Sequence, residues 1–239
     1  MSCSDVSIEP VTNPDDFTDM FNIVAAAFGD QVQDGIWIAM NPAWNTPEGR
    51  KAGARRLADR WSAMTRNSSG QPNTVFIKAT VDGVIAGLSI WQQFSTVDGH
   101  GDAPAEDLGK DVDLEALYPG NEAEQRYLVQ AMDSLHRRRW EVVREKATAS
   151  PPALMVMDLC VVDPLFQRKG IARKLVQFGL DEAQRRGGLE CFTEASSMGR
   201  LVYLKQGFKQ EGGEVVYQVD DEFKGRSMPS NIILRTGGQ

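Results

Sequence analysis

The pattern of apolar and polar positions along this chain has two different periods, one typical of strands and one typical of helices. Segments of the two kinds follow one another, which predicts an α/β fold. Strand-like runs, in which apolar residues alternate or are continuous, are interleaved with amphipathic segments whose apolar residues lie three and four positions apart. The predicted strands are 6–11, 74–81, 84–94, 154–162, 189–194, 214–219 and 231–234. The predicted helices are 17–28, 48–64, 128–142, 172–183 and 198–206. Strands that are interleaved with helices in this way favour a central sheet covered by helices.

Local turn and capping residues support several of these boundaries. Asp82-Gly83 joins the second and third predicted strands and is typical of a tight antiparallel hairpin. Thr46-Pro47-Glu48 is typical of a helix N-terminus. Residues 35–45 lack a clear period and are expected to form a loop, in which Trp37 and Trp44 pack partly buried rather than forming a substrate cage.

The segment between the third and fourth predicted strands, at about 97–150, has a different character. It begins with Gly, Asp and Pro and continues with a charged helical pattern, so we expect a helical insertion within a single domain that spans residues 1–239. A solvated helix face explains its basic run 136–139 better than a cofactor contact does. Its acidic residues allow three interpretations: a lid over an acceptor site, a contact in a homodimer, or surface decoration. These acidic residues are Asp107, Asp111, Asp113 and Glu115.

Composition and charge exclude several classes of function. The chain has 239 residues, a formal net charge of -7 and a pI near 5.0, which argues against a nucleic-acid partner and suits a cationic or amine substrate better. No signal-like or membrane-spanning apolar run is present, so we expect a cytoplasmic protein without a membrane partner. The three cysteines are widely spaced and only two histidines occur, so free thiols are expected and a metal site is not.

The segment Gln167-Arg168-Lys169-Gly170-Ile171-Ala172 stands between a predicted buried strand and an amphipathic helix. The first N–H groups of a helix lack intrahelical partners, and the helix dipole adds positive charge there, so anions bind readily. Gly170 allows close approach of a ligand, and two basic side chains precede it. The segment is therefore expected to bind a phosphate group.

Three phosphate-binding motifs can be compared with this segment. The P-loop pattern Gly-x-x-x-x-Gly-Lys-Ser/Thr and the dinucleotide pattern Gly-x-Gly-x-x-Gly are both absent. The pattern Gln/Arg-x-x-Gly-x-Gly/Ala, after a strand that ends in Val-x-Pro, resembles the pyrophosphate loop of the GNAT superfamily of acyl-CoA-dependent N-acyltransferases. Here the matching stretch runs from Cys160 to Ala172.

A second block strengthens the resemblance. Glu194-Ala195-Ser196, Gly199, Leu201-Val202-Tyr203 and Gly207-Phe208 resemble the segment that follows the fifth strand in that family. The order of the predicted elements is also similar over most of the chain, the insertion excepted. The resemblance implies a GNAT-like mixed sheet of about six to seven strands with helices on both faces, in which the fourth and fifth strands splay apart.

The resemblance also implies where acetyl-CoA binds. Backbone groups of Cys160, Val161 and Val162 would hold the pantetheine and the thioester carbonyl, and a fixed N–H there would stabilise an oxyanion. The loop would bind the pyrophosphate through Gln167, Arg168, Lys169, Gly170, Ile171 and Ala172. Ser196 and Ser197 stand where many members have an asparagine, and Ser197 is taken as a further cofactor contact.

Three residues are candidates for proton transfer. Tyr203 matches the family's tyrosine near the cofactor sulfur, whose hydroxyl can protonate the leaving thiolate, although a packing role is the alternative. Asp158 interrupts an apolar strand and, by strand parity, is expected on the same face as Cys160 and Val162, which makes it the leading candidate for the base. Glu194 is the second candidate. Either carboxylate could instead have only a structural role.

The function expected from these features is the transfer of an acetyl group from acetyl-CoA to an amine, by direct attack in a ternary complex. A small-molecule acceptor is preferred. One alternative is an acyl-CoA-binding sensor or interaction module without catalysis. A further alternative is an acetyltransferase that acts on protein N-termini or lysines.

Overall fold

The computed structural model describes residues 5–104 and 112–237, so Asp107 and Asp111 of the acidic segment lie outside the described residues. The strands are β1 (Val6–Pro10), β2 (Thr74–Val81), β3 (Val84–Phe94), β4 (Leu154–Val162), β5 (Glu190–Ser196), β6 (Lys209–Glu214) and β7 (Asn231–Arg235). The α-helices are α1 (Asp16–Val24), α2 (Gly35–Met40), α3 (Pro47–Ser62), α5 (Leu114–Leu117), α6 (Glu122–Glu145), α7 (Ile171–Arg185) and α8 (Arg200–Leu204). A π-helix, η1 (Ala25–Val32), continues α1, and a short 3-10 turn, η3 (Pro164–Phe166), follows β4.

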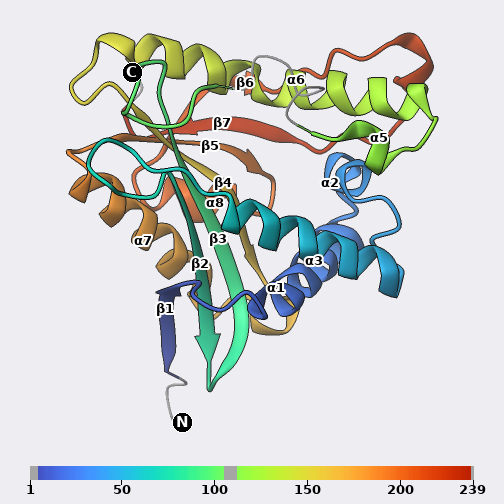
Figure 1. The fold of residues 1–239 in the computed structure, drawn as a ribbon, viewed down its shortest axis with the longest axis horizontal. Helices are drawn as coiled ribbons and strands as arrows, with labels where there is room; N and C mark the ends of the chain where they lie inside the picture. Colours follow the sequence, from blue (N-terminus) through green and yellow to red (C-terminus); the bar gives the residue numbers. More distant parts are fainter. Residues whose placement is uncertain (1–4, 105–111, 238–239) are drawn as a thin grey trace.

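The seven strands form one mixed sheet in the order β1-β2-β3-β4-β5-β7-β6 (Figure 1). Neighbouring strands are antiparallel except β4 and β5, which are parallel and are connected through α7. The predicted hairpin of β2 and β3 is confirmed, with Val81 opposite Val84. The predicted class, a mixed sheet with helices on both faces, is therefore confirmed.

The centre of the sheet opens between β4 and β5. The two strands pair only over three positions, from Leu154 with Glu190 to Val156 with Phe192. Beyond Val156, β4 stays paired with β3 as far as Val162, while β5 stays paired with β7 as far as Ser196. The predicted splay of the fourth and fifth strands is thus present.

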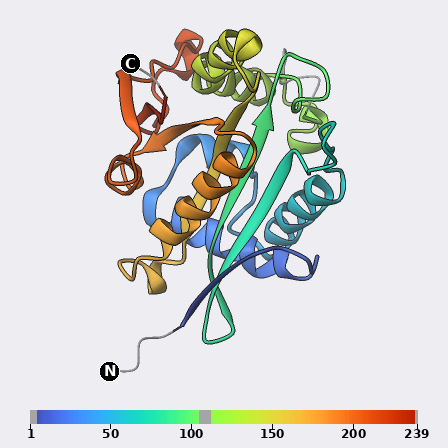
Figure 2. The ribbon, with the colours of Figure 1, turned by 90° about the vertical axis from the view of Figure 1, so that its left-hand side faces the viewer.

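Different helices cover the two faces of the sheet. On one face α7 packs across β1 to β5 and contacts α8, as Figure 2 shows with α7 in front of the strands. On the other face lie α1 and α3, while α6 passes over β5 and β7 and reaches α2. Each face of the opening between β4 and β5 therefore has its own set of neighbouring elements.

Two predicted elements differ from the structure. Residues 35–40, expected in a loop, form helix α2, because the side chain of Asp34 accepts from the N–H groups of Ile36 and Trp37 and caps it. The strand predicted at 214–219 lies earlier, at β6, where the pairing with β7 shifts between Glu211 and Glu214. The glycines between those residues concealed the strand, since glycine is depleted in strands.

Trp37 of α2 and Trp44 of the following loop are both partly buried, as expected. Trp37 contacts Phe21 and Phe28 at centroid distances of 5.9 and 6.3 Å, and Trp44 at 5.6 Å.

Within the described ranges, no helix is both long enough and apolar enough to cross a bilayer.

Candidate active site

The predicted phosphate-binding loop lies at the start of α7. Arg168 and Gly170 both have left-handed backbone angles, with φ of 65° and 81°, and Gly170 is the residue that caps α7. A left-handed turn at a helix start directs successive N–H groups toward one concave side. A Cβ added at Gly170 would meet no atom within 4 Å, so the space in front of the loop is open.

Buried side chains anchor this loop while its tip stays exposed. Ile171 is 1% exposed and packs with Leu175 against the sheet. The Gln167 amide donates to the Val162 carbonyl at 3.1 Å and to the Gln31 side chain at 2.8 Å. Gln167 therefore fixes the loop against β4 and η1, whereas Arg168 and Lys169 are exposed.

On the α7 face of the opening, Tyr203 of α8 meets Cys160 of β4. The Tyr203 hydroxyl shares a hydrogen bond with the Cys160 thiol, and both side chains belong to one apolar cluster with Met157. Burial, and then the neighbouring Cys160, raise the pKa of Tyr203 well above its usual value. Burial likewise raises the pKa of Cys160 to about 12, so this thiol stays protonated and is a poor nucleophile.

Gly199 explains how Tyr203 is held. A Cβ at position 199 would lie 2.6 Å from the Tyr203 hydroxyl oxygen, so the ring packs directly on the glycine backbone. Ser197, the other predicted contact after β5, is exposed on the turn that precedes α8.

Asp158 does not lie on the face predicted for it. In the pairing of β3 with β4, Ile90 lies opposite Leu159 and Trp91 opposite Met157, which leaves Asp158 as the extra residue of a β-bulge. A bulge breaks the two-residue alternation of a strand. Cys160 and Val162 therefore pack on the α7 side, whereas Asp158 contacts α3 and α6 on the opposite side. The parity prediction was wrong for this reason.

Asp158 and Glu194 face the same guanidinium group across the opening. Arg139 of α6 donates Nη1 to Asp158 at 2.9 Å, and donates Nε and Nη2 to Glu194 at 3.0 and 2.6 Å. The side chains of Arg139 and Glu194 are only 5% and 4% exposed, while that of Asp158 is 20% exposed. The expectation that the basic run 136–139 is a solvated helix face was therefore wrong for Arg139.

A second arginine distinguishes the two carboxylates. Arg60 of α3 donates Nη1 to Asp158 at 2.8 Å. Burial alone would raise the pKa of Asp158, but Arg60 and Arg139 outweigh it and hold the pKa far below its usual range. Burial raises the pKa of Glu194, and Arg139 offsets this only in part. Asp158 is thus a weak base, whereas Glu194 has the more basic carboxylate.

His136 lies one turn before Arg139 on α6. Its ring contacts that of Trp140 at a centroid distance of 5.8 Å. Burial, and then the charge of Arg139, hold the pKa of His136 well below 6.5. The imidazole near Arg139 and Asp158 is therefore neutral at neutral pH.

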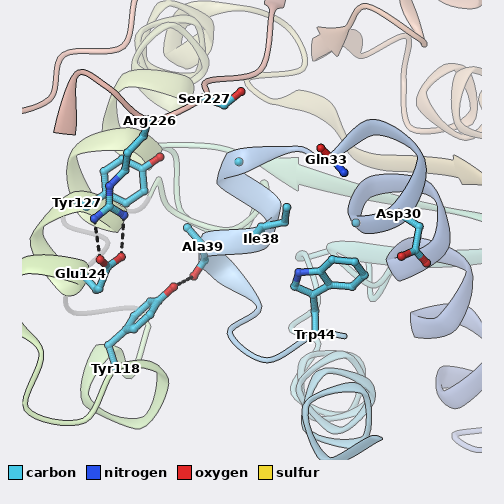
Figure 3. A pocket seen from close by; sticks show the side chains of 12 residues that line it. Asp30, Gln33, Ile38, Ala39, Trp44, Tyr118, Glu124, Tyr127, Arg226 and Ser227 are labelled. Atoms are coloured by element: carbon cyan, nitrogen blue, oxygen red, sulfur yellow. Dashed lines mark hydrogen bonds and ion pairs between the residues drawn. The ribbon is translucent and has the colours of Figure 1, made fainter. Parts of the chain in front are cut away.

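A pocket of about 640 Å³ lies on the side of the molecule formed by η1, α2 and the N-terminal half of α6 (Figure 3). In Figure 3 the Tyr118 hydroxyl donates to the Ala39 carbonyl at 2.7 Å, and Trp44 forms the opposite wall. Arg226 pairs with both oxygens of Glu124 at 2.6 and 2.7 Å and lies over the Tyr127 ring. The pocket is thus lined by aromatic rings and by a neutralised ion pair.

The segment that carries the predicted site matches a known family. Residues 146–219, which include β4, the loop, α7, β5 and α8, match the family model of the acetyltransferase (GNAT) domain. This match confirms the predicted resemblance to the GNAT superfamily over that segment. No curated protein sequence matches the chain significantly.

Solved structures share the fold along nearly the whole chain. The Drosophila melanogaster polyamine N-acetyltransferase, which forms N-acetylagmatine, has a TM-score of 0.58 and 10% identity, covering 97% of this chain and 98% of its own. The mosquito arylalkylamine N-acetyltransferase like 5b has a TM-score of 0.57 and 13% identity, covering 97% and 99%. Arylalkylamine N-acetyltransferase 2 from Aedes aegypti has a TM-score of 0.55 and 17% identity, covering 97% and 98%. At these identities the similarity establishes the fold.

Proposed function

We propose that this chain, which carries a GNAT acetyltransferase domain, transfers the acetyl group of acetyl-CoA to the amine of a small molecule. The observation that carries this proposal is the opening between β4 and β5, with an anion-binding loop beside one strand and a buried carboxylate on the other. A donor and an acceptor that enter from opposite faces would meet in this opening. Their reacting atoms would then be close and oriented, which accelerates a two-substrate reaction.

The residues on the α7 face fit acetyl-CoA. The inner edge of β4 from Leu159 to Val162 has no strand partner on β5, so its backbone can pair with an extended polyamide chain. The N–H groups at the start of α7 lie beyond the end of that edge and suit a pyrophosphate. When bound there, acetyl-CoA would supply the activated acetyl thioester, and a β4 N–H near its oxygen would stabilise developing negative charge.

Tyr203 is assigned as the acid that protonates the leaving sulfur. Its hydroxyl lies at the Cys160 side chain, on the face where the thioester would lie. Because the pKa of Tyr203 is raised, the hydroxyl stays protonated and can donate to a thiolate.

Glu194 is assigned as the group that takes the proton of the attacking amine, directly or through water. Asp158, the leading candidate on sequence grounds, is paired with two guanidinium groups and has a lowered pKa. Glu194 has one cationic partner, and its pKa is raised, so it is the stronger base of the two carboxylates.

The acceptor's non-reacting part is assigned to the pocket of Figure 3. Tyr217, which accepts from Asn231 at the start of β7, interacts electrostatically with Glu194 and with Tyr127, and Tyr127 lines the pocket. The proposal therefore includes a route from the pocket to the carboxylate past Tyr217. Its aromatic lining suits an amine with an apolar or aromatic body. Three similar structures are named for arylalkylamines or a polyamine, which supports a small amine as the acceptor class.

A binding and turnover experiment tests this function. Acetyl-CoA is expected to raise the melting temperature in a concentration-dependent manner, whereas ATP at equal concentration is not. Thiol release is then measured over a panel of arylalkylamines, polyamines and lysine-containing peptides. Amine-dependent release with small amines supports the proposal. Binding without turnover would indicate the sensor alternative, and turnover only with peptides would indicate a protein acetyltransferase.

A further inference from the structure

Arg139 belongs to α6, outside the family's matching blocks of β4, the loop and the segment after β5, yet it connects the two strands that border the opening. One of its guanidinium nitrogens donates to Asp158 on β4 and two donate to Glu194 on β5. The planar group provides a two-point contact to Glu194, which fixes the orientation of that carboxylate. These three hydrogen bonds span the place where the backbone ladder between β4 and β5 has ended.

We propose that Arg139 is a positioning residue, which holds Glu194 ionised and oriented at the opening so that this carboxylate can receive the proton of the acceptor amine. The inference rests on the proposed acetyl transfer and adds a residue of α6 to it.

The charge balance of the cluster supports this role. Arg60 and Arg139 face Asp158 and Glu194, so two cations meet two anions in a largely buried place. Asp158 keeps Arg60 if Arg139 is removed, and Arg60 is independently held, because its Nη2 donates to Gln92 at 2.9 Å. Within residues 5–104 and 112–237, Arg139 is the one cation paired with Glu194.

Removal of Arg139 is therefore expected to act on Glu194 first. A buried carboxylate without a cationic partner becomes protonated instead of remaining charged. The neighbouring titratable groups do not compensate: Asp158 repels the charge of Glu194, Tyr217 has a raised pKa, and His136, which interacts with Arg139 and Asp158, is neutral at neutral pH. A protonated Glu194 cannot accept a proton from an amine.

Three variants separate charge from orientation. Arg139→Gln removes the charge, and Arg139→Lys keeps a charge but loses the fork that contacts both oxygens of Glu194. Arg138→Gln is the matched control on the same helix, because Arg138 pairs with Glu211, Glu141 and Glu145 and does not contact the opening.

Infrared spectroscopy of the free protein measures the ionisation directly, without relying on activity. Arg139→Gln is expected to show a carboxylic-acid band at neutral pH that the wild type and Arg138→Gln lack, and that disappears in Arg139→Gln/Glu194→Gln. Arg139→Lys is expected to show no such band. If Arg139→Gln shows no new band, or if the band persists without Glu194, the proposal is overturned.

Kinetics measure the consequence for the reaction. In Arg139→Gln, kcat is expected to fall by about 10²-fold or more, with the acid limb of the pH profile moved to higher pH and the KM for acetyl-CoA little changed. In Arg139→Lys, kcat is expected to fall by roughly 10-fold with the limb unmoved. Equal losses in both variants with an unmoved limb would indicate a structural role and overturn the proposal. A wild type that acetylates no amine would instead refute the proposed function, and the infrared result would still show whether Arg139 controls the ionisation of Glu194.

Discussion

The two faces of the opening between β4 and β5 are formed by different kinds of chemical group. The α7 face uses backbone groups of one continuous stretch, from β4 through the loop into α7, and two neutral side chains, Cys160 and Tyr203. The α6 face uses charged side chains from four separate elements, which are α3, β4, α6 and β5. A backbone site depends on local sequence, whereas a side-chain cluster depends on the tertiary fold, so the two faces should respond differently to mutation.

The largest expected effect is that of Glu194→Gln on the α6 face. This change keeps the shape of the side chain and removes its basicity, so kcat is expected to fall by about 10³-fold while the KM for acetyl-CoA stays nearly constant. Asp158→Asn is the matched comparison and is expected to cost roughly 10-fold or less, because Asp158 is already engaged by two arginines. A larger loss of kcat in Asp158→Asn than in Glu194→Gln would indicate that Asp158, and not Glu194, is the base.

On the α7 face, Tyr203→Phe is expected to lower kcat by about 10²-fold, because the leaving sulfur loses its proton donor. Ser62→Ala serves as a control, since it removes an exposed hydroxyl that donates to the Asp59 carbonyl at the end of α3. Steady-state kinetics at saturating acetyl-CoA provide the comparison. If Tyr203→Phe retains full kcat, the hydroxyl is not the proton donor and Tyr203 has only a packing role.

The loop should affect binding rather than turnover. Gly170→Ala places a Cβ at φ 81° and projects it into the open side of the loop, so the Kd for acetyl-CoA is expected to rise by roughly 10-fold with kcat little changed. Gly212→Ala in β6 is matched, because its φ is 67° and its Cβ would also meet nothing within 4 Å. Calorimetric titration distinguishes them, and an equal Kd in both variants would contradict phosphate binding at the loop.

The smallest effect concerns stability on the α6 face. The pKa of His136 is lowered by burial and by Arg139 in the folded chain. As the pH falls below about 6.5, the His136 imidazole is therefore protonated in the unfolded chain but not in the folded chain. The free energy of unfolding is therefore expected to fall below pH 6.5, by up to about 1.4 kcal/mol per pH unit, until the folded imidazole also protonates.

Denaturant unfolding between pH 7 and pH 5 measures this slope. In His136→Gln the contribution should disappear, whereas Arg137→Gln, an exposed position on the same helix, should retain it. An unchanged slope in His136→Gln would show that the imidazole titrates alike in the folded and unfolded chains.

The difference between the two faces also explains what the sequence could predict. The bounds of β2, β3 and β4 were predicted as the structure has them, because each is an apolar run ended by a turn residue. The loop and Tyr203 were predicted as site residues from contiguous motifs, and these roles stay predictions. The burial of Arg139 was missed, because a basic run on a helix resembles a solvated face until the helix is placed over the opening.

Asp158 shows a second limit of sequence reasoning. Its selection as a candidate was sound chemically, since a carboxylate in an apolar strand needs a partner, and it has two. Its face was wrong, because one extra residue opposite Ile90 and Trp91 reverses the alternation. No local sequence pattern indicated that bulge. A search for distant arginines able to pair with Asp158 could, however, have found Arg60 or Arg139.

Direct transfer of a labelled acetyl group tests the central claim most directly. The wild type is mixed with acetyl-CoA that carries a ¹³C-labelled acetyl group and with the most active amine of the panel, and the products are identified by mass spectrometry. The account predicts N-acetylated amine that retains the label, formed in equal amount to free CoA and strongly diminished in Glu194→Gln. Free CoA without acetylated amine, or undiminished product in Glu194→Gln, would contradict it.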